Sequence, residues 1–149
     1  RIAEDFKLAT GTFVSVGPLR GKIIAAGAPY IQDAVLTGLN MKEVGAMVFP
    51  TPKVRELAGM PDNAPLADVL ASAPVLAHFQ KVVNELAASS TGSANRIARM
   101  CLLSEPPTID KGEITDKGSI NQRSVLTHRA DTVAALHGDT LHYILKPSH

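Results

Sequence analysis

The stretch IQDAVLTGLNMKEVGAMVF, residues 31–49, contains two strongly β-prone runs, Ile31 to Thr37 and Val44 to Phe49. Both runs are rich in apolar and β-branched residues, which pack well on a pleated surface. The segment between them, residues 38–42, contains a glycine and an asparagine and has the length of a hairpin connection. We therefore predict that the two runs are adjacent antiparallel strands in the core of the fold.

A second, smaller hairpin is predicted upstream of this pair. Residues 6–8 and 12–16 are short β-prone runs on either side of a turn that contains Gly11. Pro18 then stands where proline is favoured, near a helix start, and the apolar residues that follow are spaced to share one face. We expect a short helix that extends to about Ala26.

The region from residue 50 to residue 74 is interrupted by five prolines. Because proline breaks a helix interior, this region leaves room for short helices only, which we place at 54–58 and 66–71. Residues 75–88 follow the i, i+3, i+4, i+7 spacing of apolar side chains. They are predicted to form the clearest amphipathic helix of the chain.

The remaining sequence supplies a third strand and a last helix. Residues 97–103 are β-prone, and residues 122–136 carry an apolar stripe at helical spacing. Helices and strands do not alternate strictly, which favours an α+β fold with a small antiparallel sheet covered by helices and an N-terminal β-hairpin. Residues 138–149 form a tail that the pattern does not place.

Length and charge restrict the class of protein. The chain has 149 residues, the size of one domain, and its 15 Lys and Arg nearly balance 14 Asp and Glu, so no basic surface for nucleic acid is expected. No apolar run approaches the roughly 20 residues of a membrane helix. The lone Cys101 sits in an apolar run and is expected to be a packed thiol, which favours the reducing cytoplasm.

Several kinds of active site are not supported by the sequence. The five histidines show no ligand pair at metal-site spacing with an acidic or cysteine partner, so no metal site is predicted. Ser15 and Ser119 are in no nucleophile-elbow context, which argues against hydrolase chemistry. No Rossmann or P-loop fingerprint is present.

Two segments concentrate charge, glycine and turn residues beyond what a core requires. The first, RIAEDFKLATGTFVSVG at residues 1–17, resembles the hinge and hairpin of adenylate-forming enzymes, particularly long-chain acyl-CoA synthetases. The second, PPTIDKGEITDKGSINQR at residues 106–123, resembles the last signature of the same superfamily in the form found in feruloyl-CoA synthetases. Together they identify residues 1–137 as similar to the C-terminal lid domain of an acid–CoA ligase.

The resemblance implies a reaction in two steps. ATP, with Mg²⁺, and a carboxylic acid give an acyl adenylate, and the CoA thiol then displaces AMP after the lid has rotated. The nucleotide and acid pockets would lie on a missing N-terminal adenylation domain, so this chain alone is expected to be inactive and to bind neither ATP nor CoA tightly. The acid is expected to be ferulate or a relative.

The resemblance also suggests site residues. Lys117 is our candidate catalytic lysine, although the family places that lysine where Ser119 stands here; the alternative is a solvated turn lysine. Lys7 matches the hairpin lysine presented for the second step, or is a strand lysine that protects an exposed edge. Gly11 matches the glycine beside the pantetheine tunnel, and it also suits a turn with positive φ. Arg1 matches the arginine near the ATP ribose.

Two other functions stay open from the sequence. One is a free-standing module that binds a protein or a CoA-like ligand without chemistry. The other is a small independent enzyme, which is disfavoured because the chain has no convergent catalytic set. The family's usual pivot residue is replaced by Ala3, with Glu4 and Asp5 adjacent, so the sequence does not identify the hinge.

Overall fold

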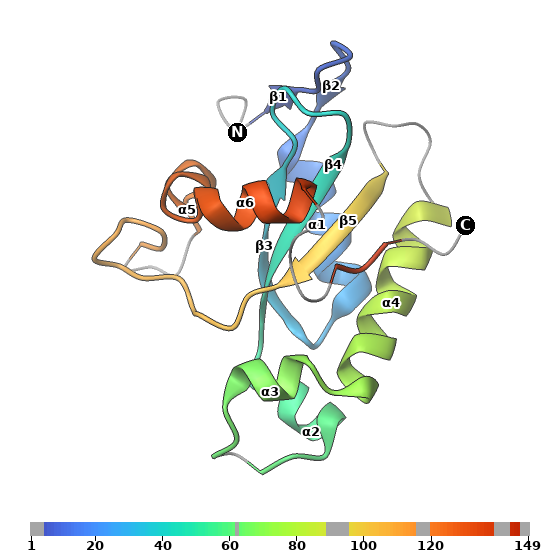
Figure 1. The fold of residues 1–149 in the computed structure, drawn as a ribbon, viewed down its shortest axis with the longest axis vertical. Coiled ribbons are helices and arrows are strands. Elements are labelled where there is room, and N and C mark those ends of the chain that lie inside the picture. Colours follow the sequence, from blue (N-terminus) through green and yellow to red (C-terminus); the bar gives the residue numbers. More distant parts are fainter. Residues whose placement is uncertain (1–4, 62, 89–95, 116–119, 139–143, 147–149) are drawn as a thin grey trace.

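A computed structural model describes residues 5–61, 63–88, 96–115, 120–138 and 144–146. Within these ranges the chain forms two small sheets and a set of helices (Figure 1). The elements in chain order are β1 Phe6–Lys7, β2 Phe13–Val14, α1 Val16–Gly27, β3 Ile31–Thr37, β4 Val44–Pro50, α2 Val54–Ala58, α3 Leu66–Leu70, α4 Ala73–Ala88, β5 Ile97–Leu102, α5 Gln122–His128 and α6 Ala130–His137. The α+β class predicted from the sequence is confirmed.

The central sheet has the strand order β3-β4-β5. β3 and β4 are antiparallel, as predicted, with Val35 opposite Met47. β5 pairs parallel to β4, with Cys101 opposite Met47, so the prediction of a purely antiparallel sheet is wrong. The chain between β4 and β5 passes through α2, α3 and α4, and such a crossover is the connection that parallel neighbours need.

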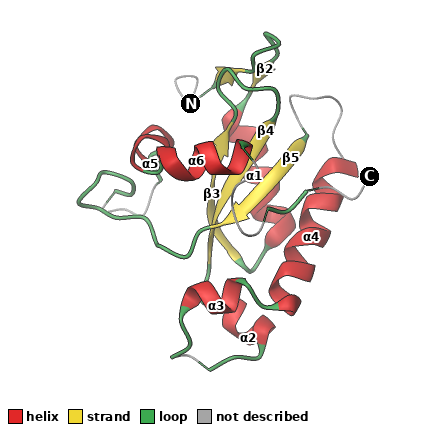
Figure 2. Ribbon diagram, in the orientation of Figure 1, coloured by secondary structure: helices red, strands yellow, loops and turns green. Residues whose placement is uncertain are grey.

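Helices cover both faces of this sheet (Figure 2). Alternate strand residues point to opposite faces. Ala34, Ala46 and Val48 belong to the larger apolar cluster, which also contains residues of α1 and α4. The smaller cluster joins the strands to α5 and α6, and its buried members are Val35, Met47, Phe49, Cys101, Leu103, Ile120, Val125 and Leu136.

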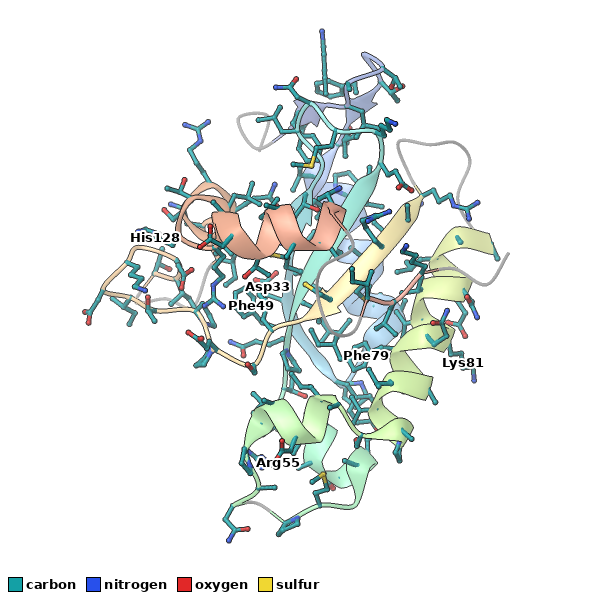
Figure 3. All side chains as sticks on the ribbon, in the orientation of Figure 1. Asp33, Phe49, Arg55, Phe79, Lys81 and His128 are labelled. Atoms are coloured by element: carbon teal, nitrogen blue, oxygen red, sulfur yellow. The ribbon has the colours of Figure 1, made fainter. Side chains whose placement is uncertain are left out.

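The helices follow the predicted pattern with one correction. α1, α2 and α4 lie where the sequence placed them, and Figure 3 shows the buried Phe79 of α4 pointing toward the sheet while the exposed Lys81 points away. The helix predicted at 122–136 is instead two helices, because Arg129 has φ −115° and ψ 32°. The side chain of Arg129, at this break, contacts acceptors outside the helix, which are described below.

Part of the unassigned tail packs on the sheet. Leu145 is 7% exposed, and it pairs with Met100 of β5 through two backbone hydrogen bonds of 2.8 Å. This bridge covers a stretch of the outer edge of β5. None of the described helices is long and apolar enough to cross a membrane.

Candidate functional site

The N-terminal hairpin is fastened to the turn between β3 and β4. Within the hairpin Lys7 stands opposite Phe13. Its backbone carbonyl accepts a hydrogen bond from the Asn40 amide at 3.0 Å, and the Ala9 amide donates to the Met41 carbonyl at 2.8 Å. The side chain of Lys7 is exposed, so its position is compatible with contact to a ligand or to another domain.

Gly11 forms the tip of this hairpin. Its φ is +89°, a conformation that favours glycine, and its amide donates to the Leu8 carbonyl at 2.9 Å. The turn interpretation of Gly11 is therefore confirmed. A Cβ at this position would meet no described atom within 4 Å, and the passage of a pantetheine arm beside Gly11 stays a prediction.

The start of the chain is described only from Asp5 onward. The Asp5 carboxylate accepts a hydrogen bond from the Val16 amide at 2.9 Å and so caps the first turn of α1. Arg1 lies outside the described residues, as do Ala3 and Glu4. The predicted nucleotide contact of Arg1 stays a prediction.

A buried ion pair organises the 104–121 loop, which carries the second motif. Glu113 is 1% exposed, and its carboxylate accepts hydrogen bonds from the Thr108 amide at 3.1 Å and the Thr108 hydroxyl at 3.4 Å. Arg129 supplies two more, from Nε at 2.8 Å and from Nη2 at 3.1 Å. We call this arrangement the Glu113–Arg129 clamp.

Arg129 also holds the beginning of the same loop. Its Nη1 donates to the Glu105 carbonyl and its Nη2 to the Pro106 carbonyl, both at 3.0 Å. The guanidinium lies over the Phe49 ring of β4, with 5.0 Å between the guanidinium carbon and the ring centroid. One side chain thus ties the loop to the sheet by charge, hydrogen bonds and a cation–π contact.

The clamp favours the charged form of Glu113. Hydrogen bonds from Arg129 lower the pKa of the Glu113 carboxyl, because the guanidinium donates to the charged form. The Thr108 amide lowers the pKa further, whereas burial opposes both effects. A buried carboxylate with this set of donors suits a structural anchor better than a proton donor in catalysis.

The predicted catalytic lysine belongs to this loop. Lys117 itself, like Ser119, lies outside the described residues. The described flanks are paired: Ile114 forms an antiparallel bridge with Ile120, and the Asn121 amide donates to the Glu113 carbonyl at 2.8 Å. Asn121 then caps α5 by accepting from the Ser124 amide at 3.1 Å.

The hairpin and the clamp lie in separate parts of the molecule. In Figure 1 the β1–β2 hairpin lies at one end of the long axis, while the chain between β5 and α5 projects from the side. The structure therefore brings Lys7 and Gly11 together on the hairpin. It does not join them to the Glu113–Arg129 clamp in one pocket.

His78, His137 and Cys101 contact other side chains of the fold and are not grouped into a site. His137 Nε2 lies 2.7 Å from the Thr37 hydroxyl, and the His78 ring contacts the rings of Tyr30 and Phe79 edge-on. Across the described ranges no cluster of three or more His, Cys, Asp or Glu is suited to a metal ion. Burial raises the pKa of the Cys101 thiol to about 12, as expected for a packed side chain.

Sequence reasoning missed the clamp and a group of exposed apolar residues. Glu113 was visible in the Gly-Glu-Ile text, but its partner Arg129 is 16 positions away inside a predicted helix. The large apolar side chains that are exposed in the described structure are Phe13 at 51%, Leu39 at 57% and Ile109 at 64%. All three lie on the hairpin, on the turn that holds it, or on the 104–121 loop.

Comparison with known proteins supplies the wider context. Residues 5–140 match the protein family described as "AMP-binding enzyme C-terminal domain". No match was found among curated proteins.

Solved structures that contain this fold include adenylation domains of carboxylic acid reductases. The domain from Segniliparus rugosus, in complex with AMP and a co-purified carboxylic acid, aligns with a TM-score of 0.64 and 20% identity over 95% of this chain. The domain from Mycobacterium chelonae aligns with a TM-score of 0.63 and 22% identity over 93% of this chain. The present chain spans only 21% and 20% of those two structures.

Proposed function

This chain belongs to the AMP-binding enzyme C-terminal domain family, and on that basis we propose that it is the lid domain of an acid–CoA ligase. The observation that carries the proposal is the family match over residues 5–140, which contains both the hairpin and the 104–121 loop. The CoA-ligase specificity, and ferulate or a related acid as substrate, are supported by the resemblance of residues 112–123 to feruloyl-CoA synthetases.

The proposed reaction has two half-reactions. In the first, a carboxylate oxygen attacks the α-phosphorus of ATP, the bond from that phosphorus to its bridging oxygen breaks, and pyrophosphate leaves. In the second, the CoA sulfur attacks the acyl carbon, the bond from that carbon to the AMP oxygen breaks, and the thiol proton passes to solvent. Mg²⁺ enters with ATP as part of the substrate.

The residues of this chain serve the two steps from different surfaces. Negative charge gathers between the carboxylate and the phosphate in the first step, and an ammonium group held there stabilises the transition state. We assign that role to Lys117, on the loop that the clamp supports. We assign Lys7 and Gly11 to the CoA side of the second step and Arg1 to the ATP ribose.

The missing partner in this proposal is an N-terminal adenylation domain. Covering an exposed apolar side chain with a partner surface removes it from water, which is favourable. Phe13, Leu39 and Ile109 are the large apolar side chains exposed in the described ranges, and they lie on or beside the two functional loops. We propose that these loops face the adenylation domain and that the complete enzyme works in the cytoplasm.

The test is ATP–pyrophosphate exchange by the complete parent enzyme, with ferulate as the acid. Replacing Lys117 with Ala is expected to slow exchange by at least two orders of magnitude, which is about 3 kcal/mol of transition-state stabilisation. The matched control is Lys111→Ala, which removes an exposed lysine from the same loop. Exchange at the wild-type rate in the Lys117 variant would show that the catalytic lysine is elsewhere.

The same measurement separates the proposal from its rival. A free-standing binding module predicts that no protein containing this domain exchanges pyrophosphate or forms a thioester with any acid. An active parent that transfers the acyl group to a thiol other than CoA would keep the adenylation half of the proposal and overturn the CoA half.

A further inference from the structure

We propose that Glu113 and Arg129 are positioning residues for the adenylation step, acting by holding the described flanks of the loop that carries Lys117. This inference rests on the proposed function for its catalytic consequence. It does not depend on that function for its structural part, which concerns the 149-residue chain itself.

The clamp restrains the loop directly beside residues 115–119. Glu113 directly precedes Ile114, which pairs with Ile120, and the Glu113 carbonyl receives the Asn121 amide. The Glu113 side chain is held by Arg129 at the corner between α5 and α6. The two flanks of residues 115–119 are therefore joined to each other and, through Arg129, to the helical layer.

The geometry of the clamp depends on an arginine at position 129. Arg129 donates to both Glu113 carboxylate oxygens and to the carbonyls of Glu105 and Pro106, four acceptors at 2.8 to 3.1 Å. A planar guanidinium can hold such a divergent set, whereas a lysine ammonium is a point charge with three donors. The fork shape, and not charge alone, determines where the loop sits.

The energetics of buried ion pairs also favour a positioning role. Desolvating two charges is expensive, so a pair such as Glu113 and Arg129 contributes little net stability compared with apolar residues of similar volume. Arg129 also lies at the break between α5 and α6. An ion pair that adds little stability and lies at a helix break is better explained as a means of fixing the geometry of the loop.

The consequence is a selective effect on one half-reaction. Misplacing a catalytic group by about 1 Å can cost roughly 100-fold in rate. Loosening the clamp is therefore expected to slow adenylation. Thioester formation from a preformed acyl adenylate should not change, because the hairpin with Lys7 is held separately, by hydrogen bonds to Asn40 and Met41.

The kinetic test uses Glu113→Gln and Arg129→Lys in the parent enzyme. Both variants should lower kcat for pyrophosphate exchange roughly 10- to 100-fold, with KM for ATP within about threefold and thioester formation within about twofold of wild type. The matched control is Glu43→Gln, which breaks the 2.8 Å ion pair with Arg99 away from the loop and should leave exchange unchanged. Equal loss in both half-reactions would overturn the inference, as would a wild-type rate in Arg129→Lys.

A second readout keeps the inference distinguishable from the proposed function. In the 149-residue chain, hydrogen–deuterium exchange of peptides covering 106–121 should accelerate at least about tenfold in both variants, while peptides of β4 and α4 keep wild-type rates. Uniform acceleration, or none, would refute local positioning. If the wild-type parent does not exchange pyrophosphate, the ligase proposal fails, and the deuterium result still decides whether the clamp fixes the loop.

Discussion

Replacing Gly45 with Ala should destabilise the fold by driving α6 away from the sheet. Gly45 lies in β4 and pairs with Thr37 of β3. A Cβ at this position would stand 2.4 Å from the Thr37 hydroxyl oxygen, 3.1 Å from His137 Nε2 and 3.1 Å from Leu136 Cδ2. These distances are too short for an undisturbed methyl group, so the side chains or α6 must move.

The magnitude follows from three contributions. Overpacking a closed core costs about 1–3 kcal/mol. Turning the Thr37 hydroxyl away gives up its 2.7 Å contact with His137, worth about 1 kcal/mol. The lower backbone entropy of alanine in the unfolded chain offsets about 0.5–1 kcal/mol. We expect Gly45→Ala to lower the free energy of unfolding by about 1–3 kcal/mol.

The assay is urea unfolding of the 149-residue chain, followed by circular dichroism. The control is Gly21→Ala in α1, where a Cβ meets no described atom within 4 Å. That variant should gain about 0.5–1 kcal/mol. In a Thr37→Ala background, Gly45→Ala should cost at least about 1 kcal/mol less, because the obstructing hydroxyl is gone. Equal cost in both backgrounds, or no loss of stability in Gly45→Ala, would refute the reasoning.

Two further predictions concern pH. The pKa of the Cys101 thiol is raised to about 12, so Cys101 should resist thiol reagents at about pH 8 until urea unfolds the chain. The free energy of unfolding should fall as pH rises from about 9 toward 12, because the thiol ionises more readily in the unfolded chain. Labelling of the folded chain at the rate of a free thiol would contradict this. The Glu113 pKa is lowered from its usual value of 4.5, so its contribution is present above that value and is lost as pH falls through the folded pKa. The stability difference between wild type and Glu113→Gln should therefore shrink as pH falls below about 4.5 in urea titrations, and a constant difference would argue against the clamp.

Local patterns predicted most of the elements. β3, β4, β5, α1, α2 and α4 all lie close to the expected residues, because apolar periodicity, proline and glycine act over a few neighbouring positions. The direction of β5 could not be predicted from local patterns. The sequence of β5 is equally suited to either direction, and the path of the crossover helices determined that it runs parallel to β4.

The candidate site divides in the same way. The two sequence motifs were enough to locate the hairpin and the 104–121 loop. The positive φ of Gly11 agrees with its predicted turn. The break at Arg129 could not be predicted from apolar spacing, and neither could its ion pair with a carboxylate 16 positions earlier. Helix periodicity contains no information about such a partner.

The sequence by itself determined the α+β class, the placement of the local elements and the resemblance to an adenylate-forming lid. Each depends on residues that are close together in the chain. The tertiary structure decided the mixed sheet, the pairing of Leu145 with Met100, and the ion pair between Glu113 and Arg129. It also placed the Arg129 guanidinium over the Phe49 ring. These features require groups distant in sequence to meet in a desolvated interior, where hydrogen bonds and charge pairing are stronger than in water.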